Sequence, residues 1–427
     1  MAQTLMGPWG RNAAIRPGGP SRSETKFKRG FVVMSNWQQL VQAVEPLQDL
    51  ELDADLVRDL EQPGQQPGHQ SGHQVPERVA HPVHFYTPTF KSYQTSEIKS
   101  CGKNAWPAVS VTGSECKLQC DHCKAAILEP MIPARTPEAL WRVVNELIDD
   151  GAQGLLLTGG SNHRNEVEYA PYYETIRRIK DSHPEFRIAA HAALMDENAA
   201  FAMADAGVDV AMMDVIGAQE TITNVYHLRR SVDDFEATLE NLVRTSMRVV
   251  PHIVIGLHYG RMLGEWRALE IIQRHLPDAV VLVVVMPFYA PEKKPFVTPD
   301  SSDVGRFFQS ARQALPDTSL LLGCARPPGE SRMQIDTYAV MAGLDGIAHP
   351  ADGAVELAAR LGRKVRVTPA CCSIVVGDEV MAVQDASDGL ELDIDTILRE
   401  EARRRAGVRG IGIPVVSASG PRTGIPA

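Results

Sequence analysis

The stretch AVSVTGSECKLQCDHC, residues 108–123, sets a short β-rich run directly before three closely spaced cysteines. Ala108–Thr112 is long enough for one buried strand. Cys116, Cys120 and Cys123 follow it with the spacing C-x3-C-x2-C. The chain on either side of this stretch decides which fold presents the cysteines.

From about residue 105 to residue 362, short β-rich apolar runs alternate with helical patterns eight times. The predicted strands are Ala108–Thr112, Gly154–Thr158, Arg187–His191, Val208–Asp214, Val249–Ile255, Val280–Val285, Thr318–Leu322 and Gly346–Ala348. The predicted helices are Pro137–Asp149, Tyr169–Ser182, Asp196–Ala206, Val232–Ser246, Met262–Arg274, Ser302–Ala314, Arg332–Ala342 and Ala354–Leu361.

This strict alternation predicts an α/β fold of parallel strands joined by right-handed crossovers. Eight units close naturally into a (β/α)8 barrel, in which the first and eighth strands pair. An open doubly wound sheet is the alternative. In a barrel, functional residues lie on the loops that follow the strands.

The barrel is expected to span residues 91–376. Residues 1–90 read as a mostly flexible N-terminal extension with short helices between Ser35 and Leu60, and with a linker rich in Gln, Gly, Pro and His at 62–74. Residues 377–427 read as a C-terminal extension with one helix, Leu392–Arg405, and a disordered end.

Composition excludes several classes of protein. The 427 residues carry 43 Lys and Arg against 53 Asp and Glu, a net charge of −10, which argues against binding to nucleic acid. No apolar run reaches the roughly 18 residues that a membrane-spanning helix needs, and no secretory signal is visible. Seven cysteines, three of them clustered, fit a metal site in a reducing compartment, so the cytoplasm is the expected location.

Three thiolates on one loop can converge on a metal centre, and thiolates suit iron–sulfur clusters. Three ligands leave one coordination position open, as a catalytic cluster requires. The alternative is a structural zinc site, which takes four ligands and would recruit His122 as the fourth. The position of the loop after the first strand of a βα series favours the cluster.

The cysteine spacing, its position and the barrel pattern resemble the radical S-adenosylmethionine (SAM) superfamily. Within it, the biotin synthase-like group and the two-component lipoyl synthases are the nearest likeness, over roughly residues 95–375. The resemblance implies a [4Fe-4S] cluster on Cys116, Cys120 and Cys123, with SAM bound to the iron that has no cysteine. Reduction would cleave SAM to methionine and a 5′-deoxyadenosyl radical, which abstracts hydrogen from an unactivated carbon.

The same resemblance assigns SAM-binding residues. His122 stands where the family has an aromatic residue, so imidazole would contact adenine. Gly159 and Gly160 match a Gly-Gly-Glu segment that binds the SAM amino group through its backbone, although Ser161 replaces the carboxylate. Asp214, at the end of strand four, matches a ribose ligand, and Arg230 a partner of the SAM carboxylate. Weaker candidates are His191 and, as apolar contacts to adenine, Ile253 and Val254.

Four cysteines remain, namely Cys101, Cys324, Cys371 and Cys372. Each is expected beside the barrel or at a strand end, so they could hold a second, auxiliary [4Fe-4S] cluster. Sulfur-inserting relatives consume such a cluster as their sulfur source, but their ligands are arranged differently. Inert buried thiols are the alternative. Arg326, which follows Cys324, could instead hold substrate.

The sequence therefore predicts a radical SAM enzyme that inserts sulfur into an unactivated C–H bond, with an octanoyl group on a lipoyl carrier protein as substrate. A second synthase subunit and an electron donor such as flavodoxin or ferredoxin are implied partners, with neither nucleic acid nor membrane. Rival functions are another radical SAM reaction, such as biotin-type ring closure or a rearrangement, and a non-catalytic metal-binding protein. The sequence assigns no catalytic side chain.

Overall fold

The computed structural model describes residues 36–62, 82–88, 95–98, 105–286, 295–376 and 379–380. Cys101, the linker at 63–81 and the helix expected at Leu392–Arg405 lie outside these residues. The central feature is a parallel sheet of 11 strands in the order β11-β1-β10-β9-β8-β7-β6-β5-β4-β2-β3. Their bounds are β1 Val83–Tyr86, β2 Ala108–Ser110, β3 Ile132–Pro133, β4 Gly154–Thr158, β5 Arg187–His191, β6 Val210–Asp214, β7 Arg248–Ile255, β8 Ala279–Val284, β9 Ser319–Leu322, β10 Gly346–Ala348 and β11 Val365–Thr368.

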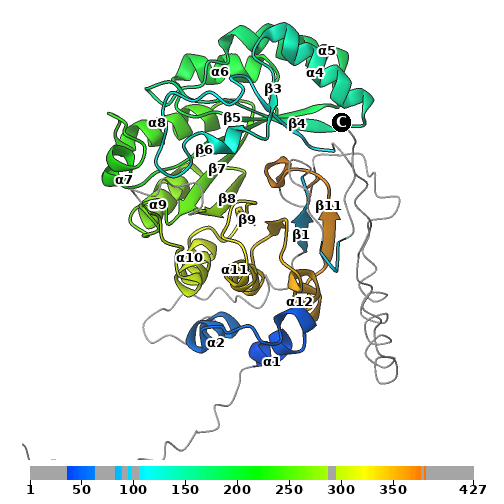
Figure 1. The fold of residues 1–427 in the computed structure, drawn as a ribbon, viewed down its shortest axis with the longest axis vertical. Helices are drawn as coiled ribbons and strands as arrows, with labels where there is room; N and C mark the ends of the chain where they lie inside the picture. Colours follow the sequence, from blue (N-terminus) through cyan, green and yellow to red (C-terminus); the bar gives the residue numbers. More distant parts are fainter. Residues whose placement is uncertain are drawn as a thin grey trace, which may run out of the picture. The chain divides into compact units, whose positions relative to one another are not determined.

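Helices follow the strands along the outer side of the curled sheet (Figure 1). Those of the βα series are α4 Pro137–Asp149, α5 Tyr173–Ser182, α6 Glu197–Asp205, α8 Val232–Val243, α9 Glu265–His275, α10 Ser301–Ala314, α11 Glu330–Met341 and α12 Ala354–Arg360. A short helix, α7 Gln219–Asn224, stands in the loop between β6 and α8. All eight predicted strands and helices are present, which confirms the α/β barrel class of fold.

The ends of the sheet differ from the expectation. The predicted first and eighth strands, β2 and β10, do not pair with each other; β10 pairs with β1 and β9. On its other side β1 pairs with β11, and Figure 1 shows these two strands side by side. Among the described residues no pairing joins β3 to β11, so the sheet is a curled, open barrel. β1 was not predicted from the sequence, because its four residues are all buried and show no alternation.

Two N-terminal helices pack on the outer layer. These are α1 Asn36–Gln42 and α2 Ala54–Glu61, and α2 contacts α10 and α11. Asp53 caps α2 by accepting from the backbone N–H of Asp55 and Leu56 at 3.0 and 2.8 Å. The backbone N–H of Asp53 donates to the Tyr338 hydroxyl at 2.8 Å. These residues belong to the N-terminal extension, and the structure gives them a packed position.

Two hydrophobic clusters form the core. The larger lies largely between the sheet and the helices. The smaller, which we call the interior cluster, contains Tyr86, Trp106, Ala189, Val210, Met212, Val250, Ala279, Val281, Leu321, Ala348, Ala370, Cys372 and Ile374. The turn η5, Cys372–Ile374, contacts β6, β8 and β10, so the segment after β11 enters the space inside the curled sheet. A two-stranded antiparallel ribbon follows, β12 Val375–Val376 with β13 Glu379–Val380.

In the part of the chain that the structure describes, no helix has both the length and the apolar character that a membrane span requires. The cytoplasmic location stays a prediction.

Candidate functional site

The cysteine loop winds tightly after β2. Gln119, Lys124 and Ala125 have φ angles of 52°, 46° and 63°, in the left-handed region that non-glycine residues seldom adopt. The N–H groups of Cys123 and Lys124 both donate to the carbonyl of Cys120, at 3.3 and 2.9 Å. Such strain concentrates at functional sites because the surrounding structure must maintain it.

The glycine turn after β4 packs directly on this loop. A Cβ on Gly160 would lie 1.9 Å from the carbonyl oxygen of Glu115, so only glycine fits there. The Gly160 N–H donates to Thr112 Oγ1 at 2.6 Å, and the Lys117 N–H donates to the Ser161 carbonyl at 2.9 Å. Cys116 Sγ also donates to the Ser161 carbonyl, at 3.7 Å. The structure therefore brings the predicted glycine turn and the cysteine loop together.

The thiols of Cys120 and Cys123 are electrostatically coupled. A hydrogen bond from the Cys120 thiol, helped by the charge of His122, lowers the pKa of Cys123 to about 4 in spite of burial. The same hydrogen bond, and then burial, raise the pKa of Cys120. A stabilised thiolate is the form in which cysteine binds metal.

The side chain of His122 connects the cysteine loop with Tyr226 and Asp214. Its ring lies on that of Tyr226, with centroids 5.1 Å apart and planes tilted by 36°. The Tyr226 hydroxyl donates to Asp214 Oδ2 at 3.4 Å. Buried Nδ1 of His122 meets no hydrogen-bond partner among the described residues. Tyr226 was not predicted from the sequence; it is buried and contacts two residues that were, His122 and Asp214.

Asp214 ends β6 between two histidines. His191 Nε2, at the end of β5, lies 3.7 Å from Asp214 Oδ1, and His252 of β7 is the direct strand neighbour of Asp214. Burial alone would raise the pKa of Asp214, but the hydrogen bond and charge of His191, and the charges of His252 and His122, lower it to about 2. Burial lowers the pKa of His252 to about 4, so this imidazole is neutral at pH 7. His191 is also brought to the site, and His252 was missed.

Arg230 lies directly before Ser231, the N-cap residue of α8. Its guanidinium contacts Glu166 Oε1 at 3.1 Å and Asp234 Oδ1 at 3.4 Å. The Arg230 side chain is 30% exposed to solvent. Glu166 follows the glycine turn along the chain. These two carboxylates orient the guanidinium and would compete with a ligand carboxylate for it.

Asp121 was also missed, although it lies within the cysteine motif. Its side chain is 3% exposed and accepts from Lys124 Nζ at 2.9 Å, and His227 Nε2 is 3.0 Å away. The Tyr259 hydroxyl donates to its other oxygen at 3.0 Å. The Asp121 N–H donates to the carbonyl of Val225 at 2.8 Å. One carboxylate therefore ties the cysteine loop to the loops after β6 and β7.

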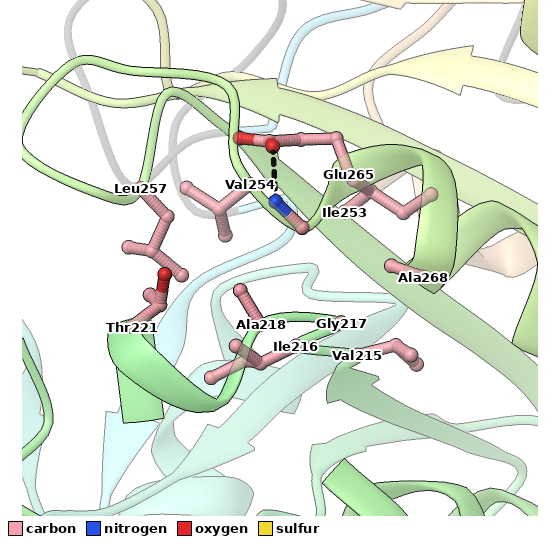
Figure 2. A pocket seen from close by; sticks show the side chains of 11 residues that line it. Val215, Ile216, Gly217, Ala218, Thr221, Ile253, Val254, Leu257, Glu265 and Ala268 are labelled. Carbon is pink, nitrogen blue, oxygen red and sulfur yellow. Dashed lines mark hydrogen bonds between the residues drawn. The ribbon is translucent and has the colours of Figure 1, made fainter. Parts of the chain in front are cut away.

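A small pocket opens between those two loops (Figure 2). Its lining residues are Val215, Ile216, Gly217, Ala218, Thr221, Ile253, Val254, Leu257, Gly264, Glu265 and Ala268. Glu265 is 4% exposed and accepts from the N–H of Gly256 at 2.8 Å and of Gly264 at 2.9 Å, and the bond from Gly264 is drawn in Figure 2. The predicted apolar residues Ile253 and Val254 line this pocket, and the buried carboxylate that shapes its rim was not predicted.

Three of the four remaining cysteines come together. Cys324, Cys371 and Cys372 all belong to or pack against the interior cluster. Cys371 Sγ lies 3.0 Å from Ser373 Oγ, and hydrogen bonds from Cys372 and Ser373 lower the pKa of Cys371 to about 7 against the effect of burial. The hydrogen bond with Cys371 raises the pKa of Cys372, and burial raises it further. The charge of Cys324 acts in the same direction. Cys101 lies outside the described residues.

Arg326 does not point into the site. Its guanidinium forms a bidentate pair with Asp336 at 2.6 and 2.8 Å, and both side chains are essentially unexposed. It also donates to the carbonyls of Gly323, Ala348 and His349. With its donors used inside the protein, the prediction that Arg326 holds substrate is wrong. Its role is to fasten the loop after β9 to the end of β10.

Within the described ranges, no group of three or more His, Cys, Asp or Glu side chains is arranged to hold a single metal ion. A four-iron cluster is larger than a single metal ion, and each of its cysteines binds a different iron. The thiolates that hold it are therefore farther from one another than the ligands of one ion. The thiolate character of Cys123, the unpartnered Nδ1 of His122 and the side-chain-free cradle at Gly160 fit such a group.

Comparison with known proteins gives one domain match. Residues 110–273 match the model described as the radical SAM superfamily, whose members use a [4Fe-4S] cluster and SAM. None of the curated proteins compared matches the chain.

Solved structures give distant similarities. Methylornithine synthase (PylB) is 13% identical, with 86% of this chain and 96% of that chain covered and a TM-score of 0.45. The [FeFe]-hydrogenase maturase HydG is 15% identical, with 77% and 75% covered and a TM-score of 0.48. SuiB from Streptococcus suis is 12% identical, with 55% and 50% covered and a TM-score of 0.41. At these values none of the three supports an assignment of the reaction.

Proposed function

We propose that this chain, which carries a radical SAM superfamily domain over residues 110–273, is an enzyme that holds a [4Fe-4S] cluster on Cys116, Cys120 and Cys123 and binds SAM beside it. The observation that carries this proposal is the packing of the cysteine loop on the glycine turn, where a Gly160 Cβ would overlap the Glu115 carbonyl. That contact joins the thiolates to the backbone that would receive SAM.

Each residue around the loop then has a task. When bound, the cluster supplies the electron that cleaves SAM to methionine and a 5′-deoxyadenosyl radical. Asp214 offers an ionised carboxylate to the ribose hydroxyls, and its low pKa keeps it ionised at any physiological pH. Arg230 exchanges one of its two carboxylate partners for that of SAM. Ile253 and Val254, which line the small pocket between the loops after β6 and β7, would offer apolar contact to the adenine ring.

The reaction that we propose is sulfur insertion into an unactivated C–H bond, with an octanoyl group on a lipoyl carrier as substrate and a flavodoxin or ferredoxin as electron donor. Its support is the grouping of Cys324, Cys371 and Cys372 inside the curled sheet, where the lowered pKa of Cys371 favours a thiolate. An ionised thiolate in an apolar interior is costly unless a metal compensates it. These residues would hold the auxiliary cluster that donates sulfur.

The decisive experiment is an anaerobic assay of reconstituted protein with dithionite, SAM and octanoylated carrier, read by mass spectrometry. Formation of 5′-deoxyadenosine together with a sulfur-bearing carrier supports the whole proposal. Deoxyadenosine with a carrier of unchanged mass would contradict the sulfur insertion and favour a rearrangement or ring closure. Colourless protein that contains zinc would overturn the assignment to radical chemistry.

A further inference from the structure

The hydroxyl of Tyr86 is buried without a hydrogen-bond partner. Tyr86 is the last residue of β1 and is 0% exposed. Within the described part of the chain no donor or acceptor meets its hydroxyl. Its side chain belongs to the interior cluster, together with Cys372 and beside Cys371 and Cys324.

Burying a hydroxyl without a partner lowers the stability of the folded protein. Most buried hydroxyls in folded proteins are therefore paired. Phenylalanine would fill the same space without this cost, and the preceding residue, Phe85, is a fully buried phenylalanine. A tyrosine at this position is therefore explained best by an acceptor that the protein binds from outside.

The ring position is specified by a glycine on the neighbouring strand. A Cβ on Gly346 of β10 would lie 2.6 Å from Tyr86 Cε2 and 2.9 Å from Leu321 Cδ2. Glycine inside a strand weakens the strand, and it marks a place where another group approaches closely. The ring thus lies across β10 in a gap that only glycine leaves, and it stays inside the barrel.

The interior cluster that contains the Tyr86 ring also contains Cys372, and Cys371 and Cys324 pack against it. Burial raises the pKa of Tyr86 well above its ordinary value, and the charges of Cys372, Asp345 and Cys371 raise it further. The Tyr86 hydroxyl is therefore a neutral hydrogen-bond donor in the cluster that also holds these thiols. A protonated thiol is a weak acceptor, whereas a metal-bound thiolate or a sulfide carries negative charge and accepts well.

We propose that the Tyr86 hydroxyl donates a hydrogen bond to a sulfur atom of an iron–sulfur cluster held by Cys324, Cys371 and Cys372, and that this bond raises the reduction potential of that cluster. This inference rests on the proposed auxiliary site. Hydrogen bonds to cluster sulfurs stabilise the more negative, reduced state, and they are one of the determinants of cluster potential.

The test isolates the second site. Changing Cys116, Cys120 and Cys123 together to alanine removes the ligands of the SAM cluster, and the full-length variant is reconstituted anaerobically with ferrous iron and sulfide. Tyr86→Phe is then introduced into this background. We expect unchanged iron content, of about four per chain, and a midpoint potential shifted to more negative values in a redox titration followed by electron paramagnetic resonance.

Tyr338→Phe is the matched control. Its hydroxyl accepts from the Asp53 backbone in the helix layer, so its loss should lower stability and leave the potential unchanged. Site-specific 2,3-difluorotyrosine at position 86 keeps the shape of the ring and makes the hydroxyl a stronger donor. It should shift the potential in the positive direction, and it keeps the test decisive should Tyr86→Phe misfold.

Two failures can be told apart. If the triple cysteine variant binds iron and both changes at position 86 leave its potential unchanged, the role of Tyr86 is overturned while the auxiliary site stands. If the triple variant binds no iron, the auxiliary site itself is overturned, and the inference about Tyr86 falls with it.

Discussion

Asp121 and Tyr259 are 138 residues apart in the chain, and the Tyr259 hydroxyl donates to Asp121 Oδ2 at 3.0 Å. Tyr259 has a φ of 56° and follows β7, in the loop that rims the pocket beside Glu265. Asp121 stands between the second and third cysteines of the motif. A carboxylate inside the cluster loop thus positions part of the loop that we expect to hold adenine.

Changing Asp121 to alanine should uncouple these loops. The hydrogen bonds to Lys124, His227 and Tyr259 are lost together, and bonds to charged groups contribute about 1.5–3 kcal/mol each where they are buried. Because Lys124 and His227 can return to solvent, we expect the free energy of unfolding of the iron-free protein to fall by about 1.5–3 kcal/mol in urea titrations. SAM affinity of the reconstituted variant should fall as well. Asp233→Ala, an exposed acidic residue on α8, is the control. Stability and SAM affinity equal to wild type would show that Asp121 positions nothing.

Each cysteine of the motif should be required for SAM cleavage. Cys120→Ala removes one ligand of the SAM-binding cluster, so we expect the absorption near 400 nm to fall to that of the auxiliary site alone, and no 5′-deoxyadenosine to form under dithionite. The measurement is chromatography of the nucleoside after anaerobic incubation. Cleavage at the wild-type rate by this variant would refute the cluster assignment.

Gly160→Ala tests the cradle. The added Cβ would meet the Glu115 carbonyl at 1.9 Å, so the cysteine loop must move and the cluster should be lost or bound with less iron. Gly151→Ala is the matched change. It meets nothing within 4 Å, although its φ of 92° makes alanine unfavourable, so it should lower stability without altering iron content. Equal iron content in both variants would contradict the role given to Gly160.

Asp214 and Arg230 should hold SAM. Each alanine substitution should weaken SAM binding by about 1.5–3 kcal/mol, the range of hydrogen bonds to charged groups, while iron content stays unchanged. Isothermal titration of anaerobic protein measures this. Arg164→Ala is the control because Arg164 bonds the same Glu166 as Arg230 but is largely exposed. Unchanged affinity in both site variants would make Asp214 and Arg230 structural residues.

The pair of Asp214 and His191 gives a pH prediction. Burial lowers the pKa of His191, but Asp214 outweighs this effect and raises it. Asp214→Asn removes the raising effect, so the His191 pKa should fall below its ordinary value of about 6.5. Nuclear magnetic resonance titration of the imidazoles in iron-free protein measures the change.

The sign for stability follows from the lowered pKa of Asp214. Its ionised form contributes stability above the unfolded value of about 3.9, and that contribution is lost as pH falls toward about 2. The stability difference between wild type and Asp214→Asn should therefore disappear in strong acid. A difference independent of pH would show that Asp214 acts through packing.

The alternation of strands and helices could be read from the sequence because most strands of the βα series are buried on both faces and most of its helices carry one apolar face. The bounds of β4, β5 and β10 agree with the prediction to the residue. Cys116, Cys120, Cys123 and the glycine turn at Gly160 could also be found, since both motifs are local and strand order places neighbouring loops at one edge.

Other features depend on contacts between segments far apart in the chain. No spacing in the sequence signals that Asp121 would meet Tyr259, or that Tyr86 would take a place between β10 and β11. For Arg326 the sequence suggested a function that the structure excludes. An arginine at a strand end appeared free to bind substrate, but its guanidinium is paired with Asp336. Local periodicity and motif spacing are thus determined by the sequence itself, whereas the partner of a buried charge, and the burial that sets its pKa, arise only when remote segments pack together.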